Sequence, residues 1–431
     1  MKRSVWEESC KLPVFDTLKS DESTDVLIIG GGMAGLLCAY FLERAGIKYL
    51  LCEANTIASG TTSKTTAVLS AQHDSIFYSE LINKFGKEKA KMYLDANLDA
   101  LEEYKVLSKE FDCNFEEMPS FISTAKNAQL MYREVQALKE IGFNAEIVKR
   151  LPLPINFEIA VKFPAQAQFN PLKFALSISN NLNIKEHTMI KKLHGTTAYT
   201  DKHKITANKI IVTSHFPFHN THGMYFTKLY QQRSYVIALE NAPHYNGTFV
   251  DYDSGLYFRN YKDLLLVGGG DHRTGKAGGG YDYLRRFINE NYPEAKEKYM
   301  WSAQDCISLD NVPYIGCYSQ SLPNVYVATG FNEWGMTTSM LSAKILTNMV
   351  LGFENRFAKV FEPSRNMIKK QLFKNLGTTI ADYVVPTKKR CTHMGCALKW
   401  NSGEHSWDCP CHGSRFSADG HIIDNPATKD L

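Results

Sequence analysis

Near the start of the chain, two short apolar runs are separated by a helical pattern. Val26–Ile29 is typical of a buried strand, Met33–Arg44 of an apolar helix ended by Gly46, and Ile47–Cys52 of a second strand. Strand, helix and strand at this spacing predict a βαβ unit, which is the building block of a parallel sheet covered by helices. Residues 25–53 therefore predict an α/β fold.

The rest of the pattern predicts more helices and a region rich in strands. Helical spacing of apolar residues is found at 76–110, 128–141, 171–179, 283–290 and 335–351. Short apolar or alternating runs predict strands at 189–193, 209–213, 234–239, 255–259, 264–267 and 324–328. Residues 352–380 are interpreted as a linker with a short helix, followed by a small module rich in Cys and His.

A glycine-rich turn joins the first strand to the first helix. Gly30, Gly32 and Gly35 fit the spacing G-x-G-x-x-G, which permits a tight turn, approach of a pyrophosphate and close packing of helix on strand. The helix N-terminus offers free N–H groups to an anion. Glu53 ends the second strand, where an acid accepts hydrogen bonds from a ribose. The arrangement predicts a dinucleotide site rather than a purely structural turn.

A second glycine-rich segment, Leu264–Gly270, resembles the first only in part. Residues 271–280 contain more glycines and cannot form an amphipathic helix, and no strand ending in an acid follows. We interpret the segment as a loop between strands and expect a single dinucleotide site. An enzyme that takes electrons from a nicotinamide cofactor through a flavin usually needs two.

The composition excludes several classes of protein. The chain has 431 residues, of which 44% are hydrophobic and 22% charged, so it is not disordered. A net charge of +4 without a long Lys/Arg run does not favour nucleic acid as a partner. The longest apolar stretch, Val26–Leu42, is interrupted by glycines and is too short for a membrane span. No secretory signal pattern is present, so we expect a cytoplasmic protein.

Three further segments carry a family resemblance. The loop Ser59–Ala67, the segment Asp310-x-x-Pro313-x-Ile315-Gly316 and the run Asn324–Gly330 resemble the D-amino-acid oxidase-like (DadA-like) family of FAD-dependent oxidoreductases. The resemblance covers most of residues 24–352. It implies a Rossmann-like α/β FAD-binding domain with an inserted antiparallel-sheet substrate domain of α+β type. The residues it implies at FAD are Gly30, Gly32, Met33, Ala34, Gly35, Glu53, Ala54, Ser59, Gly60, Thr61, Thr62, Ser63, Lys64, Thr65, Gly330, Gly335, Met336 and Thr337.

Cysteine and histidine gather near the C-terminal end. Cys391 and His393 form C-x-H, and Cys409 and His412 form C-x-x-H. Two Cys and two His suit a zinc site, but the spacing resembles that of Rieske proteins, in which two thiolates and two imidazoles hold a [2Fe–2S] cluster. The resemblance implies four cluster ligands and a disulfide: Cys391, His393, Cys409 and His412, and Cys396 with Cys411.

The module departs from the Rieske proteins of respiratory complexes in two ways. Ser414 keeps the hydroxyl that donates to a cluster sulfur, but Phe416 stands where those proteins have tyrosine, so we expect a lower potential. Only residues 378–390 are available before the first cysteine. We therefore expect a reduced base subdomain, with the cluster loops packed on the flavin domain.

These resemblances predict how the chain is organised. An N-terminal segment spans 1–23. The FAD-binding domain is discontinuous, at 24–75, 145–223 and 321–352, and the substrate domain comprises 76–144 and 224–320. A linker or helix at 353–377 leads to a small all-β Rieske module at 378–431.

A flavin accepts two electrons, whereas a cluster passes one at a time. Their fusion predicts a dehydrogenase in which an amine or amino acid reduces FAD and the cluster passes electrons to an external acceptor, ferredoxin-like or quinone-linked. The alternatives are a reductase running from an external donor, or a non-catalytic electron-transfer or redox-sensing protein. No catalytic base stands out. The candidates for the substrate site are His73, Arg233, Tyr257, Arg259, His272 and Trp334.

Overall fold

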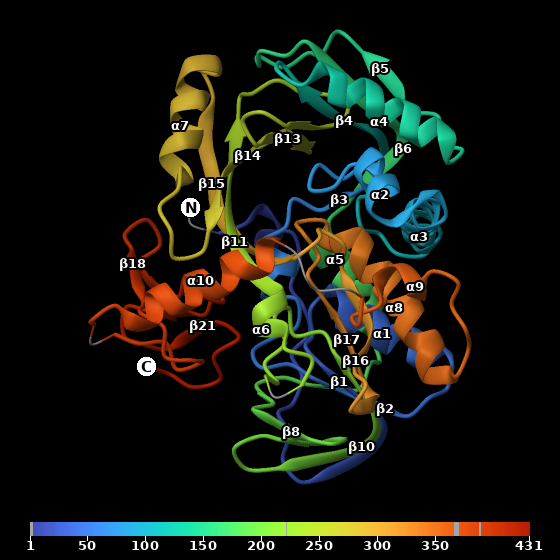
Figure 1. Cartoon of the computed structure of the whole chain (residues 1–431), viewed down its shortest axis with the longest axis vertical. Coiled ribbons are helices and arrows are strands. Elements are labelled where there is room, and N and C mark those ends of the chain that lie inside the picture. Colours follow the sequence, from blue (N-terminus) through green and yellow to red (C-terminus); the bar gives the residue numbers. More distant parts are fainter. Residues whose placement is uncertain (1–2, 221, 366–369, 388) are drawn as a thin grey trace.

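The structure is a computed structural model that describes residues 3–220, 222–365, 370–387 and 389–431. Residues 1–2 of the predicted N-terminal segment, 366–369 of the predicted linker and Lys388 lie outside the described residues. Two large sheets and one small sheet organise the chain (Figure 1).

The first sheet has eight strands and is mostly parallel. β1 (Glu22–Ile29) lies between β2 (Tyr49–Cys52) and β10 (Lys204–Val212), parallel to both. The other strands are β7 (Ile184–Lys185), β8 (Lys192–His194), β9 (Thr197–Tyr199), β16 (Tyr314–Ser319) and β17 (Leu322–Thr329). Two helices, α1 (Met33–Arg44) and α8 (Gly335–Leu351), pack against each other over this sheet. The predicted Rossmann-like α/β architecture is confirmed.

The second sheet has nine strands and is mainly antiparallel, with one parallel pair. In order, its main path runs β15 (Lys296–Ser308), β11 (Leu229–Glu240), β14 (Leu264–Arg273), β13 (Leu256–Tyr261), β12 (Thr248–Asp251), β4 (Glu116–Thr124), β6 (Ile159–Gln168) and β3 (Val68–Leu69), with β5 (Glu146–Val148) beside β6. The parallel pair, β12 with β4, joins two parts of the chain that are distant in sequence.

The helices cover the edges and faces of the two large sheets. They are α2 (Tyr78–Phe85), α3 (Lys87–Leu107), α4 (Ala128–Glu140), α5 (Pro171–Ser179), α6 (Tyr225–Lys228), α7 (Gly280–Asn291), α9 (Ala358–Phe361) and α10 (Lys370–Val384), with short 3₁₀ turns η1 (Val5–Glu8) and η2 (Thr61–Ser63). The helix expected over 76–110 is broken at Gly86, where φ is +83°. Glycine adopts this conformation without steric strain.

A four-stranded antiparallel sheet forms the C-terminal module. It contains β18 (Lys399–Asn401), β19 (Ser406–Asp408), β20 (Arg415–Ser417) and β21 (Ile422–Asp424). Its small core includes Phe416 and the four clustered cysteines. The module lies beside α10 and below α7 in Figure 1. This confirms the expected small all-β module.

The second glycine-rich segment is not a loop, contrary to expectation. β14 continues through Gly268–Gly270 as far as Arg273. A Cβ at Gly268 would lie 1.8 Å from the ring of Tyr257 on the neighbouring β13. The glycine therefore makes room for an aromatic ring that crosses the strand, which no local pattern reveals.

Strand pairing also differs from the predicted segmentation. β5 and β6 lie within 145–223, predicted as FAD-binding, yet they pair with each other and with β4 in the nine-stranded sheet. β16 lies within 224–320, predicted as substrate domain, yet it pairs with β17 in the mostly parallel sheet. α10 crosses the predicted boundary between 377 and 378. The sheet that each of these strands joins is decided by its pairing with other strands, which the local sequence does not show.

Candidate functional site

A cavity of about 580 Å³ opens where β1 and β2 end. At the turn after β1, Gly30 has φ +109°, and a Cβ there would lie 2.6 Å from the carbonyl oxygen of Thr213. A Cβ at Gly35 would lie 1.9 Å from the Gly30 carbonyl. Only glycines allow α1 to sit this close to the strand end, leaving bare backbone toward the cavity, as a pyrophosphate site requires.

Glu53 and Thr62 shape the entrance to this turn. Glu53 accepts hydrogen bonds from the N–H groups of Gly31 (2.6 Å) and Asn55 (2.8 Å). Burial raises the pKa of Glu53, and these hydrogen bonds oppose the shift. Each carboxylate oxygen keeps lone-pair capacity for a ribose hydroxyl. The Met33 N–H donates to Thr62 Oγ1 (3.0 Å), so the helix N-terminus is less free than expected.

Most residues that the resemblance implied at FAD line this cavity: Gly30, Gly32, Met33, Ala34, Glu53, Ala54, Ser59, Gly60, Thr61, Thr62, Lys64, Gly330, Gly335 and Met336. Of the remaining four, Gly35 packs under the turn and Thr65 lines an adjoining cavity. Ser63 and Thr337 bond to backbone atoms nearby.

The C-terminal module forms part of the same cavity wall. Gly403, Glu404, Arg415 and residues 422–425 contribute lining atoms. The cluster loops were expected to pack on the flavin domain, but the second loop is also held by β11, β14 and β15, which lie within the predicted substrate domain. No local signal marks the lining residues of the module, because they follow the βαβ unit by more than three hundred residues.

A smaller cavity of about 110 Å³ adjoins the larger one. The two share the lining residues Thr61, Lys64, Ala303, Asp305, Gly335 and Met336. Among the candidates for the substrate site, Tyr257, Arg259 and Trp334 line the smaller cavity, and Arg233 lines the larger one. These four candidates therefore lie around the two adjoining cavities, with Arg233 at the larger one only.

The guanidinium of Arg259 is occupied by hydrogen bonds within the chain. It donates to the carbonyl oxygens of Thr66 and Ala67 and lies 5.3 Å from the ring centre of Trp6. Burial lowers its pKa to about 9. Arg259 therefore ties the loop after η2 to the nine-stranded sheet.

The two candidate histidines are held by neighbouring groups. His73 Nδ1 lies 2.7 Å from the hydroxyl of Tyr93, and Nε2 lies 2.9 Å from the carbonyl oxygen of Ser70. Burial lowers the pKa of His73 to about 4. His272 Nε2 lies 2.9 Å from the hydroxyl of Tyr235. Neither histidine is among the described residues that line the two cavities.

The four predicted cluster ligands converge from two loops. The thiols of Cys391 and Cys409 are within hydrogen-bond contact, and the rings of His393 and His412 lie 5.0 Å apart. Nδ1 of each histidine is buried and has no hydrogen-bond partner among the described residues. Burial lowers the pKa of His393 to about 4 and that of His412 to about 3. Neutral rings with unpaired Nδ1 atoms beside two thiols fit a cluster held by two thiolates and two imidazoles.

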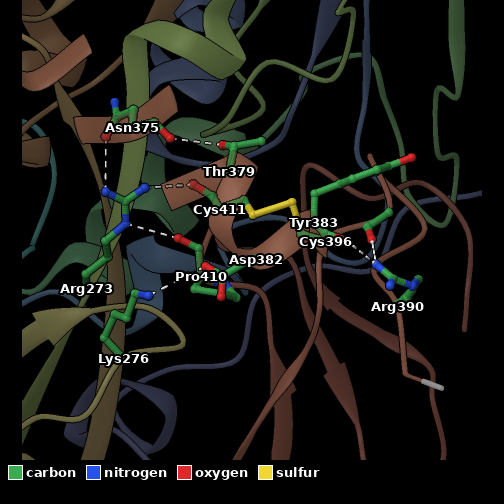
Figure 2. The surroundings of a disulfide bond; sticks show 11 residues. Arg273, Lys276, Asn375, Thr379, Asp382, Tyr383, Arg390, Cys396, Pro410 and Cys411 are labelled. Atoms are coloured by element: carbon green, nitrogen blue, oxygen red, sulfur yellow. Dashed lines mark hydrogen bonds and ion pairs between the residues drawn. A yellow bond between two sulfur atoms is a disulfide. The ribbon is translucent and has the colours of Figure 1, made fainter. Parts of the chain in front are cut away.

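A disulfide joins Cys396 and Cys411 and links the two cluster loops (Figure 2). The sulfur of Cys409 lies within 4.8 Å of both. Because a disulfide sulfur is not a thiolate ligand, Cys396 and Cys411 are bridge residues, and Cys409 remains the ligand predicted on this loop.

Arg273, at the end of β14, holds the second cluster loop. Its guanidinium donates to the carbonyl oxygens of Pro410 and Cys411, both at 3.0 Å, and to Oδ1 of Asn375 on α10 at 3.1 Å (Figure 2). One half-buried cation thus connects the nine-stranded sheet, α10 and the cluster loop.

β15 has a different neighbour on each of its faces. Ala303 and Asp305 line the smaller cavity. Ser302 and Gln304 bond to the C-terminal module, and Gln304 Nε2 donates to the Gly413 carbonyl at 2.9 Å. Successive side chains of a strand point to opposite faces, so this one strand contacts both the cavity and the cluster loop.

β11 shows the same alternation. Ser234 lines the smaller cavity. On the other face, Gln231 Nε2 donates to the His412 carbonyl at 2.9 Å, and Arg233 Nε donates to Glu404 at 3.0 Å. The β11–β15 pair therefore separates the smaller cavity from the cluster module by the thickness of one sheet.

Hydrogen bonds continue from the larger cavity to the cluster loop. His215 lines that cavity, and its Nε2 lies 3.1 Å from Oε1 of Gln231. Gln304 donates to the same oxygen at 2.8 Å. The sequence did not mark these three residues, because an isolated Gln or His carries no motif.

Glu404 joins the module to β11. It pairs with Arg233 and lies 3.2 Å from Arg415, which in turn bonds to Asp408 and Asp424. Burial raises the pKa of Glu404, but the two arginines outweigh that effect and lower it from 4.5 to about 2. The charge of Glu404 is therefore favoured in the folded state.

We expect Glu404→Gln to cost about 3 kcal/mol of stability at pH 7, the equivalent of this pKa shift. A carboxylate with a depressed pKa stabilises above its unfolded pKa, so the difference should shrink as the pH falls from 4.5 toward 2. Urea titrations at pH 7 and pH 4, followed by the visible absorbance of the cluster, measure the difference in free energy of unfolding between the variant and the native protein. Glu294→Gln, at an exposed site, is the control. Equal midpoints for the Glu404 variant and the native protein at pH 7 would contradict the prediction.

Comparisons of the sequence with known families match almost the whole chain. Residues 25–349 match the model described as FAD dependent oxidoreductase (DAO), and residues 367–431 match the Rieske [2Fe-2S] domain. The putative Rieske 2Fe-2S iron-sulfur protein YhfW of Bacillus subtilis (strain 168) is 34% identical over 492 residues, covering 99% of this chain and 96% of that protein. The Rieske match favours a [2Fe–2S] cluster over zinc.

Solved structures share the fold of the larger part. Glycine oxidase from Geobacillus kaustophilus superposes with a TM-score of 0.69 at 18% identity, covering 80% of this chain and 99% of that chain. L-proline dehydrogenase from P. horikoshii gives 0.67 at 15% identity, covering 80% and 98%. Among the described residues, no helix combines the length and apolar character needed to cross a membrane.

Proposed function

Because the chain belongs to the FAD-dependent oxidoreductase family and ends in a Rieske [2Fe–2S] domain, we propose that it is a dehydrogenase for an amine or amino-acid-like substrate. Its electrons leave one at a time to an external acceptor. The protein binds FAD and a [2Fe–2S] cluster. When bound, FAD accepts a hydride and the cluster passes single electrons.

In the proposed reaction, the substrate loses a hydride from the carbon next to its nitrogen and a proton from the nitrogen, leaving a C=N bond. Water hydrolyses this bond to a carbonyl compound and ammonia or an amine. Two electrons leave in two steps, to two equivalents of a ferredoxin-like or quinone-linked acceptor. The names of two fold neighbours, glycine oxidase and L-proline dehydrogenase, support an amine as the reacting group.

The observation that carries the proposal is the contact between the cluster loop and the strands that wall the cavities. Gln231, Arg273 and Gln304 all donate to carbonyl oxygens of this loop. They hold the cluster module against the wall of the predicted FAD site, as transfer between the two requires. An oxidase needs no such module, since O₂ reacts directly with reduced flavin.

The N-terminus of α8 supports the chemistry from the protein side. Gly335 and Met336 line both cavities. The positive end of the helix dipole therefore faces the region where the two cavities meet, and it favours negative charge there. Such charge develops on a flavin ring when it is reduced.

Anaerobic visible and EPR spectra test the proposal. Purified holoprotein is measured before and after addition of a panel of amines and amino acids. We expect flavin absorbance to bleach and a reduced Rieske signal to follow. Reduction of the flavin only by a ferredoxin-like donor would instead establish the reverse path. If both centres are present and no panel member reduces either, the assignment as an amine dehydrogenase is wrong.

A further inference from the structure

The smaller cavity is lined by three carboxyl groups from three different elements. Asp74 follows β3, Asp305 lies on β15, and Glu333 precedes α8. A fourth carboxyl, that of Asp271 on β14, lies close enough for its charge to act on Glu333. Three acids lining a small cavity, with a fourth close by, are unfavourable unless something compensates their charge.

Only some of these acids accept side-chain hydrogen bonds from described residues. Trp334 donates to Asp74 at 3.1 Å, and Gln232 donates to Glu333 at 2.8 Å. Asp305 accepts no hydrogen bond from any described residue, although it lines both cavities. Oδ1 of Asp271 is fully buried and also has no partner within the described part of the chain. A carboxylate that faces a cavity without a partner can accept a hydrogen bond from a bound ligand.

The cations at this cavity are already engaged. Lys64 forms an ion pair with Glu7 at 2.7 Å. Arg259 donates to the carbonyl oxygens of Thr66 and Ala67. Neither side chain is free to clamp a substrate carboxylate, which would also be repelled by the acids opposite.

The surroundings raise the pKa of two of these acids. Burial raises the pKa of Asp305 to about 6. Burial, followed by repulsion from Asp74 and Asp305, raises that of Asp271 to about 8. A cation bound among these groups would replace lost hydration and offset the repulsion.

We propose that the smaller cavity binds the substrate as an alkylammonium cation that carries no carboxylate beside its amine, with Asp305 as the principal counter-ion. The apolar part of the lining, which includes Val236, Phe249 and Phe258, suits an alkyl chain. The identification of this cavity as the substrate site rests on the proposed function. The inference narrows the substrate class from amines and amino acids to amines that carry no carboxylate beside the nitrogen.

The test compares 1,4-diaminobutane with alanine on the FAD-loaded, cluster-containing full chain. Anaerobic titration gives the apparent Kd from perturbation of the flavin spectrum, and bleaching is recorded separately. We expect diaminobutane to bind at least ~10-fold more tightly than alanine, and Asp305→Asn to weaken its binding by at least ~10-fold, as for a lost charged hydrogen bond. Asp282→Asn, on the exposed face of α7, is the matched control. Flavin content and the EPR signal verify that each variant is folded.

The outcomes separate this inference from the proposed function. Perturbation by diaminobutane without bleaching supports the cation site, and the oxidative direction is then overturned only if no other amine of the panel bleaches the flavin. Tighter binding and bleaching by alanine overturns the cation site and leaves amine oxidation standing. Absence of any perturbation by diaminobutane, or equal binding to the native protein and Asp305→Asn, also overturns the inference.

Discussion

Cys409→Ser is expected to abolish the [2Fe–2S] cluster while FAD stays bound. A serine hydroxyl does not replace a thiolate as an iron ligand, and this cysteine is buried at the meeting point of the two cluster loops. The cluster's visible and EPR signals should disappear. Substrate-dependent reduction of a one-electron acceptor should fall to background, whereas bleaching of the flavin by substrate should persist.

Cys317→Ser is the matched control, because Cys317 lies on β16 and its thiol bonds only to the nearby carbonyls of Ser319 and Leu322 among the described residues. It should keep both cofactors and full electron transfer. An undiminished Rieske signal in the Cys409 variant would refute the predicted ligand set. Loss of flavin bleaching as well would show that the module is needed to build the cavity.

Gly35→Ala is expected to weaken FAD binding on the order of 100-fold. The added methyl would lie 1.9 Å from the Gly30 carbonyl and 2.9 Å from Thr213 Oγ1, so α1 must move away from the strand end. Overpacking of this kind costs about 3 kcal/mol, which corresponds to that loss of affinity if it falls on the FAD-bound geometry. Titration of the flavin-free protein with FAD, followed by fluorescence quenching, measures the effect.

Gly377→Ala provides the comparison for this substitution. Gly377 is exposed on α10 and has no atom within 4 Å of its added Cβ. Alanine there should leave FAD affinity unchanged and favour the helix by about 1 kcal/mol. Equal FAD affinity of the Gly35 variant and the native protein would show that the fingerprint does not depend on close packing of helix and strand.

The features that sequence analysis predicts best are local. The βαβ unit and its glycine turn lie within residues 25–53, so strand, helix, turn and acid are read from one window. The four predicted cluster ligands also come from two short segments, and the structure brings them together. In both cases the spacing along the chain reflects the chemistry that those residue types perform.

The nine-stranded sheet is less accessible to such analysis. β4 pairs with β6, which follows after a helix, and with β12, which is distant in sequence. Gly268 of β14 is explained by Tyr257 on the adjacent strand. The docking residues Gln231 and Gln304 depend on the register of β11 with β15 and on where the C-terminal module lies. These features depend on tertiary contacts and leave no local pattern in the sequence.

Under the proposed function, the alternation of side chains along β15 gives contact with the substrate and contact with the cluster module to different residues of one strand. Odd-numbered positions such as Ala303 and Asp305 line the smaller cavity, and even-numbered ones such as Ser302 and Gln304 bond to the cluster module. A substitution at Ala303 or Asp305 therefore changes the lining of the smaller cavity without removing the hydrogen bonds of Ser302 and Gln304 to the module. Under the proposed function, we therefore expect relatives to differ in substrate through the odd-numbered positions while they keep the contact between β15 and the cluster module.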